Sequence, residues 1–174
     1  TLKPMKILKQ NSGFKSPINV KIEDFIVEDL GEIREETVKL REKYGFTRQK
    51  ILQFSIDLDN LYDKDNEDKN VLVFPGNHDC NTIFGWYKTL DDEHKFKLKE
   101  FLRKNECYDI NVNIGIMQYL LKCKAKMPII MVQDILGLDE NSRINIPGTE
   151  SDKNWSWKLI DFEDFKERIK DYNI

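Results

Sequence analysis

His78 and Asp79 lie in the stretch VLVFPGNHDCNT (residues 71–82), directly after an apolar run and a Pro-Gly turn. Four apolar residues that end at a glycine turn predict a buried strand, and α/β enzymes carry titratable groups at the carboxyl ends of such strands. A His-Asp pair in this place could bind one metal of a pair that hydrolyses phosphoesters. It could instead hydrogen-bond the hydroxyls of a sugar, so the rest of the sequence has to separate these two chemistries.

The metal-binding alternative requires more ligands than the sequence offers. Two metal ions need roughly six to eight ligands, and a binuclear phosphoesterase takes some from an upstream Asp-x-His and a Gly-Asp-x-x-Asp. Asp92 and His94 form an Asp-x-His, but it lies downstream of His78 in a strongly charged segment, and no Gly-Asp-x-x-Asp occurs. We therefore expect no metal site and no cofactor, and the phosphoesterase remains a third hypothesis.

Apolar runs alternate with amphipathic segments along the chain, which predicts an α/β fold with a parallel sheet. The expected strands cover residues 25–28, 51–56, 71–74 and 128–133, and the expected helices cover residues 32–44, 91–105, 109–124 and 162–172. About four parallel strands alternating with helices make half of a (β/α)8 barrel or a small doubly wound sheet. Polar residues follow every expected strand: Glu28, Asp57, His78 with Asp79, and Gln133 with Asp134.

Helical spacing also indicates which side chains face the core. One expected stripe consists of Leu98, Phe101 and Leu102, and a second consists of Ile110, Ile114, Met117 and Leu121. The helix over residues 32–44 is acidic in its first turn and basic in its last, and we expect it to stop at Gly45.

Composition limits the class of protein. The chain has 174 residues, of which 40% are hydrophobic and 34% charged, and we expect one globular domain over residues 1–174. Its net charge is −3 and no basic stretch is interleaved with aromatic residues, which argues against nucleic acid and anionic membrane as partners. No apolar run approaches the ~20 residues of a membrane span. The three cysteines form no Cys-x-x-Cys, so we expect a reducing, cytoplasmic location.

A series of motifs further along the chain favours the sugar-binding alternative. In order, from about residue 23 to about residue 168, they resemble the C-terminal half of the 4-α-glucanotransferases, the amylomaltase or disproportionating-enzyme family. The motifs are EDLG (28–31), ILQF (51–54), GNHDCNTIFGWY (76–87), QDILGL (133–138), RINIPGT (143–149) and NWSW (154–157). The resemblance implies the C-terminal half of a (β/α)8 barrel and the retaining transfer of an α-1,4-glucan segment to the 4-hydroxyl of another glucan.

The resemblance assigns roles to individual residues. Glu28 matches the family's acid/base, and Asp79 matches a third carboxylate that binds the sugar being transferred. His78 and its neighbour Asn77 are expected to hold the same sugar. Asp57, or Asp59 in its place, is expected near the acceptor sugar, and Trp86 could stack on a glucose ring. The residues alone leave other interpretations open: Glu28 could belong to a helix-entry pair, His78 and Asp79 to a turn, and Trp86 to the core.

The chain also departs from the family pattern. Asn77, Cys80 and Asn81 stand where the family has Thr, Asn and Asp around the His-Asp pair. No part of residues 1–22 resembles the stretch that carries the nucleophilic Asp in the family. We therefore expect the chain alone to be inactive, and its open strand edges to pair with the absent half of the barrel or with another copy. The alternative function is a non-catalytic remnant that binds glucan or a partner.

Overall fold

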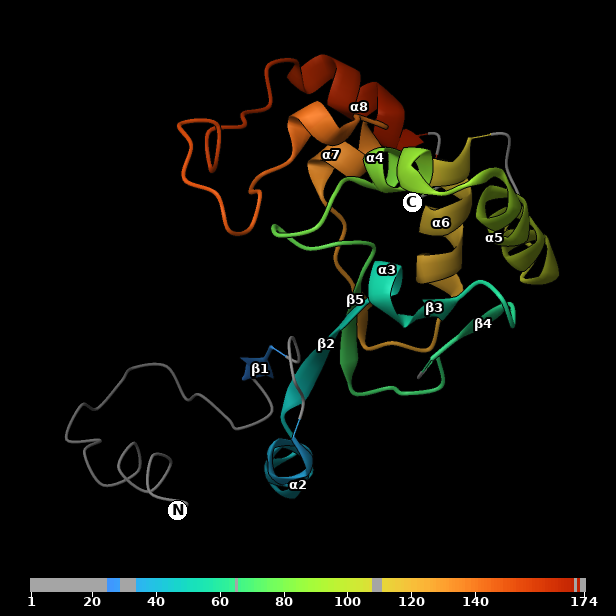
Figure 1. Cartoon of the computed structure of the whole chain (residues 1–174), viewed down its shortest axis with the longest axis vertical. Coiled ribbons are helices and arrows are strands. Elements are labelled where there is room, and N and C mark those ends of the chain that lie inside the picture. The colour runs from blue at the N-terminus through green and yellow to red at the C-terminus, as the bar shows by residue number, and fades with distance from the viewer. Residues whose placement is uncertain (1–24, 29–33, 65, 108–110, 171, 173–174) are drawn as a thin grey trace.

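A four-stranded parallel sheet forms the centre of the computed structural model, which describes residues 25–28, 34–64, 66–107, 111–170 and 172 (Figure 1). Its strands are β1 (Ile26–Val27), β2 (Thr47–Ile51), β5 (Val71–Phe74) and β6 (Met127–Pro128), in the spatial order β1-β2-β5-β6. The spatial order repeats the chain order, as it does along the wall of a barrel. The prediction of four parallel strands in an α/β fold is confirmed.

β5 has the bounds expected from its sequence. Val71, Leu72 and Val73 are all buried, because a parallel strand in the interior of a sheet is covered on both faces. Its neighbours are β2, with Lys50 opposite Val73, and β6, with Pro128 opposite Val73. The turn that carries His78 and Asp79 therefore starts from the best-buried strand of the sheet.

The second expected strand was placed too late in the chain. β2 ends at Ile51, and the residues predicted to continue it form the short helix α3 (Leu52–Ser55) and the strand β3 (Ile56–Asp57). β3 pairs antiparallel with β4 (Tyr62–Asp63), apart from the main sheet. Most residues of β2 are polar, so the pattern of apolar runs does not indicate this strand. The fourth strand is also shorter than predicted, because α7 (Val132–Ile135) occupies the end of its expected range.

The helices agree better with the sequence. The observed helices α2 (Glu35–Tyr44), α5 (Asp92–Lys104), α6 (Val112–Lys122) and α8 (Phe162–Lys170) all fall in expected ranges. Gly45 ends α2 with φ at 67°, a conformation that glycine adopts without strain. The helix α4 (Ile83–Thr89) was not expected, and the Thr82 side chain caps it by accepting a hydrogen bond from the Gly85 backbone N–H.

The hydrophobic core lies between the sheet and the helices α5 and α6, which Figure 1 shows on one side of the molecule. The predicted α5 stripe is confirmed, because Leu98, Phe101 and Leu102 are buried. The predicted α6 stripe is wrong in part: Leu121 is 41% exposed, Ile114 is only half-buried, and Ile110 lies outside the described residues. α6 contacts α4, α5 and α7, so its buried face is broader and includes Val112, Ile116, Met117 and Leu120.

Candidate active site

The turn after β5 is built largely from its own side chains. The Asn77 side-chain oxygen accepts hydrogen bonds from the Asp79 backbone N–H (3.0 Å) and from the Cys80 thiol (3.2 Å). A Cβ at Gly76 would lie 2.7 Å from Gln53 Nε2 and 2.8 Å from Cys80 Cβ, so only glycine fits there. Asn77 and Cys80, two of the departures from the family pattern, are both buried in this turn. The structure thus places Asn77, expected to contact sugar, beneath the His-Asp pair.

His78 and Asp79 stand out from this turn towards solvent. Their side chains are 43% and 40% exposed, and His78 Nε2 lies 3.5 Å from Asp79 Oδ2. The ring of Trp155 lies 5.2 Å from the imidazole of His78, centre to centre, at an angle of 38°. Trp155, which belongs to the motif NWSW, is itself 65% exposed, so its ring lies beside His78 and outside the core.

Arg143 and Asn145, for which the sequence predicts no individual role, hold Asp79 in place. The Arg143 guanidinium donates to the Asp79 backbone carbonyl at 2.9 Å, and the Asn145 side-chain amide donates to Asp79 Oδ1 at 2.7 Å. Both residues belong to the motif RINIPGT, which was recognised in the sequence as part of the resemblance. The motif therefore pointed to the right segment, but only the structure shows which of its side chains reach Asp79.

Glu28 directly follows β1 and its side chain is exposed. β1, β2 and β5 run parallel, so Glu28 lies at the same end of the sheet, the carboxyl end of its strands, as the turn with His78 and Asp79. The carboxyl ends of parallel strands are where barrel enzymes assemble their catalytic groups.

Asp57 and Trp86 come together in a different hollow. Both line a pocket of about 410 Å³ that is formed by residues of α3, β3, α4 and the first turn of α5, which contributes His94. Asp57 accepts hydrogen bonds from the backbone and side chain of Asn60, and the side-chain bond is the main reason that the pKa of its carboxyl is lowered. Neither Glu28 nor the His78–Asp79 pair lines this pocket. The predicted residues thus fall into two groups.

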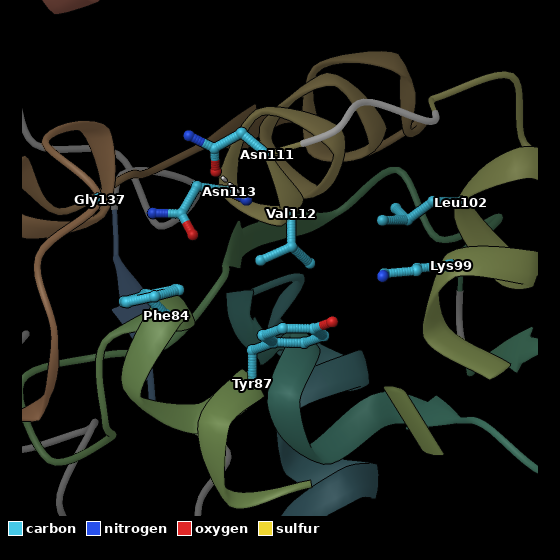
Figure 2. A pocket seen from close by; sticks show the side chains of 8 residues that line it. All are labelled: Phe84, Tyr87, Lys99, Leu102, Asn111, Val112, Asn113 and Gly137. Atoms are coloured by element: carbon cyan, nitrogen blue, oxygen red, sulfur yellow. Dashed lines mark hydrogen bonds between the residues drawn. The ribbon is translucent and has the colours of Figure 1, made fainter. Parts of the chain in front are cut away.

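A second pocket, of about 280 Å³, lies in the helical layer (Figure 2). Figure 2 shows the rings of Phe84 and Tyr87 from α4 on one side and Lys99 from α5 on another, with Asn113 at the start of α6. None of the predicted site residues lines it.

Asp134 follows the last strand of the sheet, but its role is structural. Its side chain is buried, and its Oδ1 accepts a hydrogen bond from the Ile83 backbone N–H (2.7 Å) at the start of α4. Burial raises the pKa of this carboxyl to about 7. Asp134 therefore anchors the helix that follows the His-Asp turn.

Two further observations concern metals and membranes. Within the described ranges, no three His, Cys, Asp or Glu residues are grouped so that they could hold a metal ion. Among the helices of the same ranges, none is long and apolar enough to cross a membrane.

Comparison with known proteins identifies the family of this chain. The sequence model of the 4-alpha-glucanotransferase family matches residues 7–162, so the match begins upstream of about residue 23, where the resemblance was expected to start. The chloroplastic/amyloplastic 4-alpha-glucanotransferase of Solanum tuberosum is 36% identical over 138 residues, which make up 78% of this chain and 23% of that protein. The 4-alpha-glucanotransferase of Clostridium butyricum is 36% identical over 141 residues, 79% of this chain and 28% of that protein.

Solved structures agree with the sequence comparison. The amylomaltase from Streptococcus agalactiae, solved in complex with acarbose, matches with a TM-score of 0.70 and 26% identity over 85% of this chain and 31% of that chain. The amylomaltase from Corynebacterium glutamicum shares the fold, with a TM-score of 0.61 and 16% identity. The expected fold class, part of a (β/α)8 barrel, is confirmed. The chain spans about a quarter of the length of the curated relatives, and it belongs to the 4-alpha-glucanotransferase family.

Proposed function

We propose that the chain is the C-terminal part of a retaining 4-α-glucanotransferase, which moves a segment of an α-1,4-glucan onto the 4-hydroxyl of an acceptor glucan or glucose. One observation carries the proposal: in a chain of this family, Glu28 and the His78–Asp79 turn both lie at the carboxyl ends of parallel strands of one sheet. Both carboxylates are accessible to a substrate, because both side chains are at least partly exposed.

Glu28 is proposed as the acid/base. A retaining mechanism needs a carboxylic acid that protonates the leaving oxygen and a second carboxylate, about 5 to 5.5 Å away, that forms the covalent intermediate. Glu28 follows β1, an edge strand of the described sheet, whose free edge is open to another strand. We propose that a strand supplied by the rest of the barrel pairs there and brings the nucleophile to Glu28. Self-association through this edge is the competing outcome for the chain alone.

Asp79 and His78 are proposed to bind the transferred sugar. Asp79 offers a carboxylate oxygen as acceptor for sugar hydroxyls, and the His78 imidazole supplies a further donor or acceptor. The pocket of about 410 Å³ that holds Asp57 and Trp86 is proposed as the acceptor site, since its volume falls in the usual range for ligand pockets. Asn77 contributes by holding the turn, because its side chain already bonds Asp79 and Cys80.

A reducing, cytoplasmic location is proposed on the state of the cysteines. Cys80, Cys107 and Cys123 are all free, and burial raises the pKa of the Cys80 and Cys107 thiols, which keeps them protonated and unreactive.

The proposal is tested by joining the chain to an upstream part of the barrel. The chain is assayed with maltotriose alone and fused behind the upstream part of the Clostridium butyricum relative. We expect no turnover by the chain alone, and release of glucose and longer glucans by the fusion. Glu28→Gln should reduce the fusion's rate by several orders of magnitude, as loss of one member of a catalytic set does. An active fusion that tolerates Glu28→Gln would contradict the assignment.

A non-catalytic glucan-binding remnant is the second candidate. The changes at Asn77 and Cys80 favour it, because both lie in the turn that presents the His-Asp pair. It predicts a fusion that folds and binds maltooligosaccharides but does not turn them over, with binding lost in Asp79→Ala.

A further inference from the structure

Three hydrogen bonds hold Asp79 in place, two at its backbone and one at its carboxylate. Its backbone N–H donates to Asn77, its backbone carbonyl accepts from Arg143, and its carboxylate oxygen Oδ1 accepts from the Asn145 amide. Only Oδ2 is left without a close donor among the described residues, with His78 Nε2 at 3.5 Å. The orientation of the carboxylate thus depends on the Asn145 contact, because the other two bonds fix the backbone alone.

The segment that carries Asn145 is braced before it reaches Asp79. The Arg143 side chain donates to the Asn145 carbonyl at 3.2 Å, and the Trp155 backbone N–H donates to the Ile144 carbonyl at 2.6 Å. Asn154 closes the same loop by accepting from the Ile146 backbone N–H at 3.3 Å. This clasp, residues 143–155, is the orange segment that Figure 1 shows beside the green turn after β5.

The clasp contacts both members of the pair from opposite ends. Asn145 engages Asp79, and the Trp155 ring lies against the imidazole of His78. Trp155 has φ at 61°, a backbone conformation that is strained for a bulky residue and that the surrounding contacts must maintain. The same backbone places the indole next to His78.

The Asp79 carboxylate and the His78 imidazole lie close enough that they could bond each other instead of a sugar. A small rotation of the Asp79 side chain would close the 3.5 Å gap and form a direct His78–Asp79 hydrogen bond. Both groups would then bond each other instead of a sugar. The hydrogen bond from Asn145 opposes this rotation, because a charged acceptor makes it stronger than a bond between neutral groups.

We propose that Asn145 is a positioning residue for Asp79, which holds Oδ1 so that Oδ2 and the His78 imidazole stay apart and available to the sugar. The inference rests on the proposed function for its consequence in glucan binding, and on the described contacts for its geometry. Asn145 acts through Asp79 and transfers no proton itself, since its amide does not titrate.

The experiment is a double-mutant cycle on maltoheptaose binding, measured by calorimetry on the fusion that carries Glu28→Gln, which should bind the glucan without turning it over. Asn145→Ala should raise the Kd about tenfold or more in the parent, and less than about twofold once Asp79→Ala is present. Asn141→Ala is the matched control, because among the described residues Asn141 bonds only Asp139, and the variant should leave the Kd unchanged. A parental Kd in Asn145→Ala, or the same loss with and without Asp79, would overturn the proposal.

A second readout needs no glucan. The Asn145 side-chain amide should exchange slowly with solvent in the ¹⁵N-labelled chain and quickly in Asp79→Ala. If Asp79→Ala fails to fold, Asp79→Asn takes its place in the same comparison. If maltoheptaose does not bind the parent, the proposed function fails, and amide exchange then decides the inference: protection that depends on Asp79 supports it, and exchange that is the same in both chains refutes it.

Discussion

Lys50 and Asp63 form an ion pair that is closed off from solvent: Nζ lies 2.7 Å from Oδ2, and the two side chains are 4% and 1% exposed. The Tyr119 hydroxyl donates to the same carboxylate oxygen at 2.8 Å, and the Ser55 hydroxyl donates to the other at 2.6 Å. Burial, and then the charge of Asp63, raises the pKa of the Tyr119 hydroxyl far above its usual value. This network joins β2, the β3–β4 hairpin and α6.

Removal of Asp63 should destabilise the chain strongly. Asp63→Ala leaves the Lys50 ammonium buried without its partner, which typically costs about 3–5 kcal/mol. The free energy of unfolding, measured by urea denaturation, should fall by that amount. Asp152→Ala is the control, because Asp152 is exposed and should change the value by less than about 0.5 kcal/mol. An Asp63→Ala chain within about 1 kcal/mol of the parent would show that Lys50 reaches water.

The same residues show what the sequence could and could not predict. Val71–Phe74 is an apolar run and Gly45 a helix stop, and both are visible in a short window of sequence. β2 escaped because it buries Thr47 and Lys50, whose partners Asn70 and Asp63 come later in the chain. Partnerships between polar residues far apart in sequence leave no periodic signal.

The site follows the same rule. The resemblance named His78 and Asp79 from contiguous motifs, but the contact between Asp79 and Asn145 spans 66 positions. The motif NWSW contains Trp155, but only the structure shows that this residue has a positive φ and that its ring lies beside His78.

Asp134 should make stability depend on pH. Its pKa is about 7 in the folded chain against 3.8 as a free group, so the folded chain holds this proton more tightly. The resulting stabilisation is complete below about pH 4 and is lost as the pH rises through 7. Asp134→Asn stays neutral and can still accept from Ile83. Its free energy of unfolding, relative to the parent, should therefore rise by about 2–3 kcal/mol between pH 5 and pH 8. A constant difference would refute the raised pKa.

Gly76 and Gly45 offer a matched pair of alanine variants. Gly76→Ala forces a Cβ against Gln53 and Cys80 and should displace the His78–Asp79 turn, weakening maltoheptaose binding by the Glu28→Gln fusion about tenfold. Gly45→Ala meets no atom within 4 Å but has φ at 67°, so it should cost about 1 kcal/mol of stability and leave the Kd unchanged. Equal binding by both variants would show that the turn tolerates the displacement.

Trp86 provides a direct test of the pocket that it shares with Asp57. A glucose ring stacked on the half-buried indole would change its environment, so maltotriose should alter the tryptophan fluorescence of the fusion. Trp155 and Trp157 also emit, and single phenylalanine variants separate the signals of the three tryptophans that this chain contributes. We expect the fluorescence change to disappear in Trp86→Phe and to persist in Trp157→Phe. Trp86→Ala should weaken the use of acceptor about tenfold, or ~1.4 kcal/mol. The opposite pattern, with the signal lost only in Trp155→Phe, would move the principal sugar contact from the Asp57 pocket to the His78–Asp79 turn.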